Sequence, residues 1–319
     1  MAVPGVARVT APSPPMWAIT SYYNPARYKR RLANYRTFRA NLRVPLVAVE
    51  LSFDGRFELA KDDADILIQI SGGAVLWQKE RLLNLATKAL PPDVRDIAWL
   101  DCDIVFEQAD WSRAAQERLV GANIVQLFSE LVDFGPDDVQ PNAGRALRPT
   151  GQGIVSALGA GAAELGAAAE TWQSIRAFPT GVAWAARRDV LDRHGLYDAL
   201  IAGGGDLAMV HAMYGAFDIE AQLHCLDSVR RAHYLGWARP FHRAIGEKIA
   251  TLPGRVYHLW HGAFANRRNR ERHRLLAEFD FDPAADLVIG ANGAWQWARP
   301  RRDLENFLTN YFLNRNEDE

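Results

Sequence analysis

The sequence predicts an α/β fold with a mostly parallel central sheet flanked by helices. Apolar segments of strand length alternate with segments of helical periodicity over residues 16–130, and this alternation is typical of parallel sheets covered by helices. One apolar run, 97–100, ends abruptly in two carboxylates, Asp101 and Asp103, before apolar residues resume. A buried parallel strand reads as a continuous apolar run, and open α/β sheets bind ligands beyond the carboxyl ends of such strands. The pair therefore marks a candidate ligand site.

Composition and charge bound the class of protein. The chain has 319 residues, 49% hydrophobic and 24% charged, with a formal net charge of −1. These values suit a globular protein of one large domain or two intimate ones. A nucleic-acid-binding protein is not expected, because such proteins usually carry a strongly basic domain. Two cysteines, Cys102 and Cys225, make no disulfide framework and favour a reducing compartment.

The sequence carries no targeting or membrane-spanning signal that we can recognise. Residues 1–15 are rich in Pro and Ala, lack the apolar core of a signal peptide, and are expected to form a flexible leader. No apolar run is long enough to cross a bilayer. We therefore expect a cytoplasmic protein without a transmembrane segment, for which peripheral contact with a membrane stays open.

The first half of the chain supplies four expected strands and three expected helices. The first helix has Tyr28, Leu32, Tyr35 and Phe38 at helical spacing, and its basic residues, Arg31 among them, are interpreted as a solvated face. The second helix runs from Trp77 to about Leu90, where two prolines follow it. The expected strands are 16–21, 44–51, 65–70 and 93–100, and a third helix is expected at 111–119.

The second half has a less regular pattern. A strand at 122–128 is followed by a Gly-, Ala- and Pro-rich segment, 135–171, which is either a functional lid or a tolerated insertion. Pro240 is expected to interrupt a helix at 227–250. The basic segment 267–274 is interpreted as a solvated helix face. The other expected elements are a strand at 178–186, helices at 187–194 and 207–214, a strand and turn at 256–262, and helices at 266–277 and 303–313.

Four groups of polar residues follow these apolar segments and suggest one site. They are the pair Asp101 and Asp103, the turn 203–206, the imidazoles of His258 and His261, and the polar residues of 79–84. Two carboxylates and one imidazole suit Mn²⁺ or a similar borderline ion better than Ca²⁺, and such an ion can neutralise a leaving diphosphate. Each group also has a plainer interpretation, because strand-end aspartates cap turns and histidines on apolar segments are often core residues.

This order of motifs resembles that of the GT-A glycosyltransferases, specifically the metal-dependent nucleotide-sugar transferases. The resemblance extends from about Trp17 to about His261. It implies a GT-A fold, Rossmann-like, with a mostly parallel sheet and a C-terminal helical extension. Residues 16–265 would form the catalytic domain, with a nucleotide-binding half at about 16–130 and an acceptor-binding half at about 131–265. Residues 266–319 would form the extension.

The resemblance also implies roles for the nucleotide side of the site. Asp101-Cys102-Asp103 matches the family's Asp-x-Asp, which binds the metal and the nucleotide diphosphate. One late histidine completes the metal shell in many members, and whether His258 or His261 does so stays open. The segment that holds Thr20, Tyr22 and Asn24 resembles the family's nucleotide-contacting turn. Lys79, Arg81 and Asn84 resemble the polar residues of the helix that precedes the metal-binding strand in the family.

On the acceptor side, Gly203-Gly204-Gly205-Asp206 resembles the turn that carries the general base of inverting members. This chain departs from the family there, because several members have two or three acidic residues preceded by Trp-Gly, whereas only Asp206 is present. Gly204 and Gly205 would lie beside the sugars. Trp184 would either stack on a sugar ring or pack as a core aromatic.

The resemblance therefore implies an inverting hexosyl- or N-acetylhexosaminyl-transferase. It would use Mn²⁺ or Mg²⁺ and a nucleotide-diphosphate sugar, with a UDP-sugar favoured. The acceptor would be a glycan, a lipid-linked compound or a small molecule. Two alternatives remain: a nucleotidyltransferase that uses the same aspartates, and a nucleotide- or carbohydrate-binding protein without activity. The first usually has a Gly-rich basic loop near the first strand, which Thr20 to Pro25 does not provide.

Overall fold

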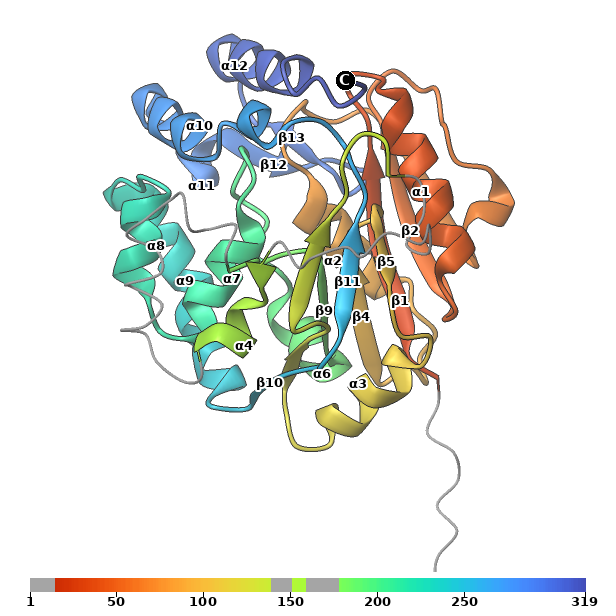
Figure 1. Ribbon diagram of the computed structural model, residues 1–319. Helices are drawn as coiled ribbons and strands as arrows, with labels where there is room; N and C mark the ends of the chain where they lie inside the picture. The colour runs from red at the N-terminus through yellow and green to blue at the C-terminus, as the bar shows by residue number, and fades with distance from the viewer. Residues whose placement is uncertain (1–14, 139–150, 159–177) are drawn as a thin grey trace, which may run out of the picture.

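A central seven-stranded sheet organises the computed structural model, which describes residues 15–138, 151–158 and 178–319 (Figure 1). The strand order is β10-β6-β9-β4-β1-β2-β3. All neighbours are parallel except β9, which runs antiparallel to both β4 and β6. The predicted mostly parallel sheet flanked by helices is thus confirmed. The strands are β1 (Trp17–Tyr23), β2 (Leu46–Ser52), β3 (Ile66–Ser71), β4 (Asp96–Leu100), β6 (Ile124–Gln126), β9 (Ala183–Arg187) and β10 (Ile249–Thr251).

Helices cover both faces of this sheet. Successive strand residues point to opposite sides, and apolar residues on both sides are buried under helices. Val47, Ile97 and Trp184 face one apolar core, and Ala98 and Leu100 belong to the other. The first core is closed by α2 (Lys79–Lys88), α6 (Arg188–His194), α7 (Gly205–Met213) and α9 (Ser228–Ile245), and the second by α1 (Lys29–Asn41) and α3 (Trp111–Leu119). The remaining helices of this part are α4 (Ile154–Leu158) and α8 (Phe217–Leu223).

A second sheet of four strands joins three segments that are distant in the sequence. It has the order β5-β11-β7-β8, with β5 at Ile104–Phe106, β7 at Glu130–Asp133, β8 at Gly151–Gln152 and β11 at Arg255–His258. Its register places His258 opposite Ile104 on one side and opposite Asp133 on the other. The Leu259 amide also donates to the Asp103 carbonyl at 2.8 Å. Residues more than 120 positions apart in the chain therefore meet at one point.

The C-terminal segment lies over the carboxyl ends of the strands (Figure 1). It contains the two expected helices as α10 (Asn269–Leu276) and α12 (Arg302–Leu313). It also contains the short helix α11 (Pro283–Asp286) and an antiparallel pair, β12 (Leu287–Ile289) and β13 (Trp295–Trp297), which the sequence pattern did not predict. The final residues hold the start of α1. The Asp318 carboxylate accepts from the Lys29 and Arg30 amides, and the Tyr28 hydroxyl donates to the Leu313 carbonyl at 2.7 Å.

Other expectations differ from the structure in detail. The break expected at Pro240 was wrong, since α9 runs through it. Tyr234 and Phe241 are buried in the core on either side of Pro240, and this packing holds both halves of the helix in place. Nearly all of the expected leader and most of the Ala- and Gly-rich stretch lie outside the described residues.

Within the described part of the chain, every helix is too short or too polar to span a bilayer.

Candidate active site

A cavity of about 290 Å³ lies beyond the carboxyl ends of β1 and β4. The loop after β4, the start of α7, the end of β11 and the C-terminal segment all contribute to its wall. This is the edge of a parallel sheet where α/β proteins bind ligands. The structure brings seven of the residues singled out from the sequence to this wall: Lys79, Asp101, Asp103, Gly204, Asp206, His258 and His261.

Asp103, His258 and His261 form a group that could hold a metal ion. Their ligand atoms all lie within 4.8 Å of one another. The two Nε2 atoms lie 3.8 and 3.6 Å from the Asp103 carboxylate. Asp103 Oδ1 is buried without a hydrogen-bond partner in the described part of the chain, which is costly unless something compensates. Burial raises the pKa of Asp103 although His258 opposes it. One carboxylate and two imidazoles fit Mn²⁺ or a similar divalent ion.

His258 is held by a residue that the sequence did not single out. Its Nδ1 lies 2.8 Å from Asp133 Oδ1, so the carboxylate fixes the ring and leaves Nε2 toward Asp103. Metal-ligating histidines usually have such a carboxylate or carbonyl on their other nitrogen. Asp133 ends β7, and only the register of β7 with β11 places it beside His258. A local sequence pattern contains no signal for that pairing.

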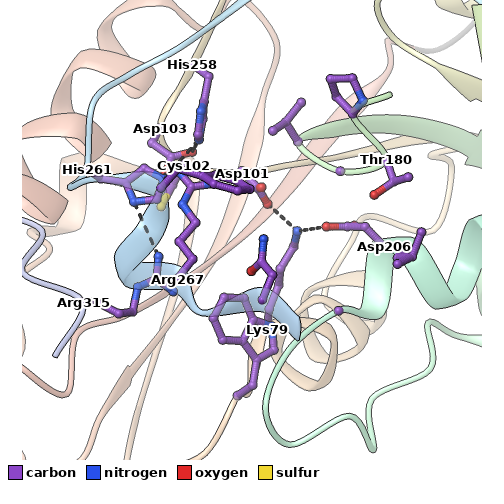
Figure 2. Close-up of a pocket in the computed structure, with 18 of the residues that line it drawn as sticks. Lys79, Asp101, Cys102, Asp103, Thr180, Asp206, His258, His261, Arg267 and Arg315 are labelled. Carbon is purple, nitrogen blue, oxygen red and sulfur yellow. Dashed lines mark hydrogen bonds and ion pairs between the residues drawn. The ribbon is translucent and has the colours of Figure 1, made fainter. Parts of the chain in front are cut away.

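His261 lies among cations. Arg267 donates to its Nε2 at 2.8 Å, and Arg315 lies 3.5 Å from its Nδ1. Burial, followed by Arg267, lowers the pKa of His261 well below its ordinary value, so the ring is neutral and offers a lone pair. A metal at His261 Nε2 would take the lone pair that now accepts from Arg267. Figure 2 shows Arg267 reaching His261 beside Asp103.

Lys79 joins the two acidic motifs of the site. Its Nζ lies 2.6 Å from Asp101 Oδ1 and 2.7 Å from Asp206 Oδ2 (Figure 2). Burial favours the neutral amine, but Asp101 and Asp206 outweigh it and raise the pKa of Lys79 well above its ordinary value. Lys79 is therefore a buried ammonium between two carboxylates. Asp101 contacts this ammonium, and Asp103 alone of the Asp-x-Asp pair belongs to the three-residue group above.

The glycines allow α7 to start against the cavity wall. Gly203 and Gly204 have φ of +86° and +101°, values that side chains rarely tolerate. A Cβ on Gly204 would lie 2.5 Å from His224 Nε2, and one on Gly181 would lie 2.7 Å from Asp206 Oδ2. Gly205 packs directly on Glu80 and is not part of the lining. The turn thus places Asp206 at the cavity. Gly204, the N-cap residue of α7, makes no side-chain capping hydrogen bond.

The expected nucleotide-contacting turn after β1 does not line the cavity through its predicted residues. The Thr20 hydroxyl donates to the Leu100 carbonyl at 2.7 Å. Tyr22 and Asn24 both donate to Glu58, at 2.9 and 3.0 Å. Their polar groups hold the loop after β2 in place. Ser21 and Tyr23, their neighbours, are the residues of this segment that reach the wall.

Three further predicted residues are used in packing. Arg81 pairs with Asp198 at 3.1 Å, and Asn84 donates to the Leu196 carbonyl at 2.9 Å, so both tie α2 to the loop before α7. Trp184 is fully buried in the core, with its Nε1 donating to the Thr180 carbonyl at 2.9 Å. None of the three is in the cavity lining. The structure therefore does not bring them to the site.

Several arginines that were interpreted as solvated line the cavity instead. Arg31 pairs with Glu317 at 2.6 Å and donates to the Tyr23 carbonyl at 2.9 Å. Arg272 is buried, and it donates to the Tyr311 hydroxyl and to His273 Nε2. The interpretation was wrong because the C-terminal segment folds back over these faces, which no local periodicity reveals. Arg267 and Arg315 belong to the same basic wall.

Comparison with solved structures gives distant similarities. TarS 1–349 of S. aureus matches with 11% identity and a TM-score of 0.39, over 94% of this chain and 71% of that one; TarS 1–349 has also been solved in complex with UDP-GlcNAc. M. tuberculosis glucosyl-3-phosphoglycerate synthase matches with 11% identity and a TM-score of 0.39, over 89% and 87%. Mannosyltransferase PcManGT from Pyrobaculum calidifontis, in complex with GDP-Man and Mn²⁺, matches with 14% identity and a TM-score of 0.42, over 94% and 70%. No family model and no curated protein matches.

The buried carboxyl of Glu80 gives a testable dependence of stability on pH. Burial raises the pKa of Glu80 to about 8, and its Oε1 has no hydrogen-bond partner in the described part of the chain. At pH values between the ordinary pKa of a glutamate and about 8, Glu80 is ionised in the unfolded chain but still protonated in the folded one. The free energy of unfolding of the wild type therefore falls as pH rises through this range. Glu80→Gln has no such carboxyl and does not show this fall. Its free energy of unfolding relative to wild type should therefore increase from pH 5 to pH 8 in urea titrations.

The exposed Glu247→Gln is the matched control, and its difference from wild type should stay constant over the same range. A constant difference for Glu80→Gln would show that the carboxyl is already ionised in the folded protein.

Proposed function

We propose that the protein is a metal-dependent glycosyltransferase of the GT-A type that moves a sugar from a nucleoside-diphosphate donor to an acceptor hydroxyl with inversion. The observation that carries the proposal is the group Asp103, His258 and His261 in one cavity with Asp206, at the carboxyl edge of a parallel sheet. A divalent-cation site and a separate carboxylate are the two groups that such a reaction needs. The sequence resemblance supports the same assignment.

The donor side of the site combines the candidate metal ligands with a basic wall. Asp103, His258 and His261 would hold Mn²⁺ or Mg²⁺, which when bound supplies positive charge to the departing diphosphate. Arg272 supports the same role, because it forms no ion pair with a carboxylate of the described residues and its donors reach the cavity wall. An uncompensated buried guanidinium favours an anionic ligand. UDP is the favoured nucleotide, on the sequence resemblance alone.

Asp206 is the proposed base. Burial raises its pKa above the ordinary value, while Lys79 opposes that shift and favours the carboxylate. As the acceptor oxygen bonds to the anomeric carbon, its proton would pass to an Asp206 oxygen. The bond from that carbon to the phosphate oxygen breaks on the opposite side, and its electron pair leaves with the diphosphate. Attack from the opposite side inverts the anomeric configuration.

The nucleotide specificity and the metal requirement can be tested together by thermal unfolding. Wild-type protein should be stabilised by UDP with Mn²⁺ more than by either alone, by about 2.7 kcal/mol at a hundred times the dissociation constant. Asp103→Asn should lose the Mn²⁺-dependent part, because it removes the carboxylate of the group. Glu130→Gln, on β7 outside the cavity lining, is the control that should respond as wild type does.

GDP in place of UDP tests the base preference in the same assay. A wild-type protein whose unfolding temperature responds to neither nucleotide, with or without Mn²⁺, would contradict the proposed function.

The assignment of the base is tested by Asp206→Asn. Turnover of the sugar donor should fall by about a hundredfold or more, the scale of a lost general base, while stabilisation by UDP and Mn²⁺ persists. Exposed Asp189→Asn is the control and should keep wild-type turnover. Proton NMR of the product should show an inverted anomer. Unchanged turnover in Asp206→Asn, or a retained anomer, would remove Asp206 from this role.

A further inference from the structure

A buried cluster of one carboxylate and two imidazoles lies behind the start of α7. Glu220, on α8, accepts from His211 Nδ1 at 2.6 Å through one oxygen and from His224 Nδ1 through the other. All three side chains are almost completely buried. The mechanism proposed above uses none of them, and neither the sequence motifs nor the resemblance points to them.

The hydrogen bonds of the cluster set which nitrogen of each ring faces Glu220. Burial alone would raise the pKa of Glu220, but His224 and then His211 outweigh it and lower the pKa to about 2. The ionised carboxylate has only acceptors, so each ring donates through Nδ1. Nε2 of each imidazole is consequently directed away from Glu220.

The two imidazoles differ in where their Nε2 atoms lie. His211 Nε2 is buried without a hydrogen-bond partner in the described part of the chain, and His211 is not in the cavity lining. His224 lines the cavity, and its Nε2 lies where a Cβ on Gly204 would be 2.5 Å away. Gly204 is the residue before the first turn of α7, two positions from Asp206. The carboxylate-held imidazole and the proposed base thus flank the same turn.

The neighbouring imidazole is already engaged. His273 also lines the cavity, with its ring centroid 4.1 Å from that of His224. Its Nε2 accepts from Arg272 Nε at 3.3 Å. His224 Nε2 makes no hydrogen bond to the residues that the structure describes, so it is the nitrogen of this pair that is open to a ligand.

We propose that His224 is an acceptor-side residue whose Nε2 forms a hydrogen bond with a second hydroxyl of the acceptor, next to the one that Asp206 deprotonates. This rests on the proposed function. The acceptor is then a compound with at least two neighbouring hydroxyl groups, such as a sugar ring. In hydrolysis, a water molecule bonded to His224 takes the place of the second hydroxyl, and the attacking water gives its proton to Asp206. An imidazole can do this without placing a second negative charge beside Asp206, which would raise the pKa of that carboxylate further.

The cluster offers a matched pair of variants. His224→Gln and His211→Gln each remove one imidazole from the same Glu220 carboxylate, but only His224 lines the cavity. The probes are UDP-glucose and UDP-N-acetylglucosamine with Mn²⁺ in water, and release of UDP is followed. His224→Gln should lower kcat of hydrolysis about tenfold, the value of one hydrogen bond to the nucleophile, and leave KM for the donor unchanged. His211→Gln should keep the wild-type kcat while lowering Tm at least as much.

The remaining outcomes separate this inference from the proposed function. Unchanged kcat in His224→Gln, or an equal fall in both variants, would show that the cluster only supports the fold and would contradict the inference alone. A wild type that is stabilised by UDP with Mn²⁺ but releases no UDP from either probe would contradict the role given to His224 toward water. A wild type that neither turns over the probes nor responds to UDP or GDP would contradict the proposed function, and the inference with it.

Discussion

The register of the small sheet is the constraint on which the site depends. Because β11 pairs antiparallel with β5 and parallel with β7, His258 lies opposite Ile104 and Asp133 at once. That pairing sets the Asp103 carboxylate, the His258 ring and its supporting Asp133 at one point, and the turn after β11 adds His261. A shift of one residue in β11 would turn His258 to the other face of this sheet. The candidate metal group is therefore a product of strand pairing between distant segments.

A single buried ammonium joins the two other aspartates of the cavity. Asp101 follows β4 and Asp206 lies in the first turn of α7. At close range their negative charges would repel each other. Lys79 lies between them at 2.6 and 2.7 Å and compensates both. The C-terminal segment supplies the remaining charge, since Arg267, Arg272 and Arg315 enter the same wall. The cavity wall thus combines acidic side chains with positively charged ones.

Sequence reasoning predicted the parts of this arrangement that depend on local pattern. The alternation of apolar strands and helices predicted the sheet, and the placement of Asp101, Asp103, Asp206 and both late histidines at one cavity agrees with what the motifs suggested. It did not predict the partners that depend on long-range pairing. Asp133 and the Glu220 cluster reach the site only through strand register and helix packing. Trp184 shows the reverse case, because a conspicuous aromatic beside a glycine turn is explained by the core.

The central claim is that Asp103, His258 and His261 form the metal site, and the position of the metal tests it most directly. Crystals of the full chain grown with MnCl₂ and UDP would locate Mn²⁺ by anomalous scattering at the manganese edge. The account predicts a peak between the Asp103 carboxylate and the two Nε2 atoms, with Arg267 moved away from His261. A peak held by other residues, or Mn²⁺ bound without either imidazole, would contradict the account.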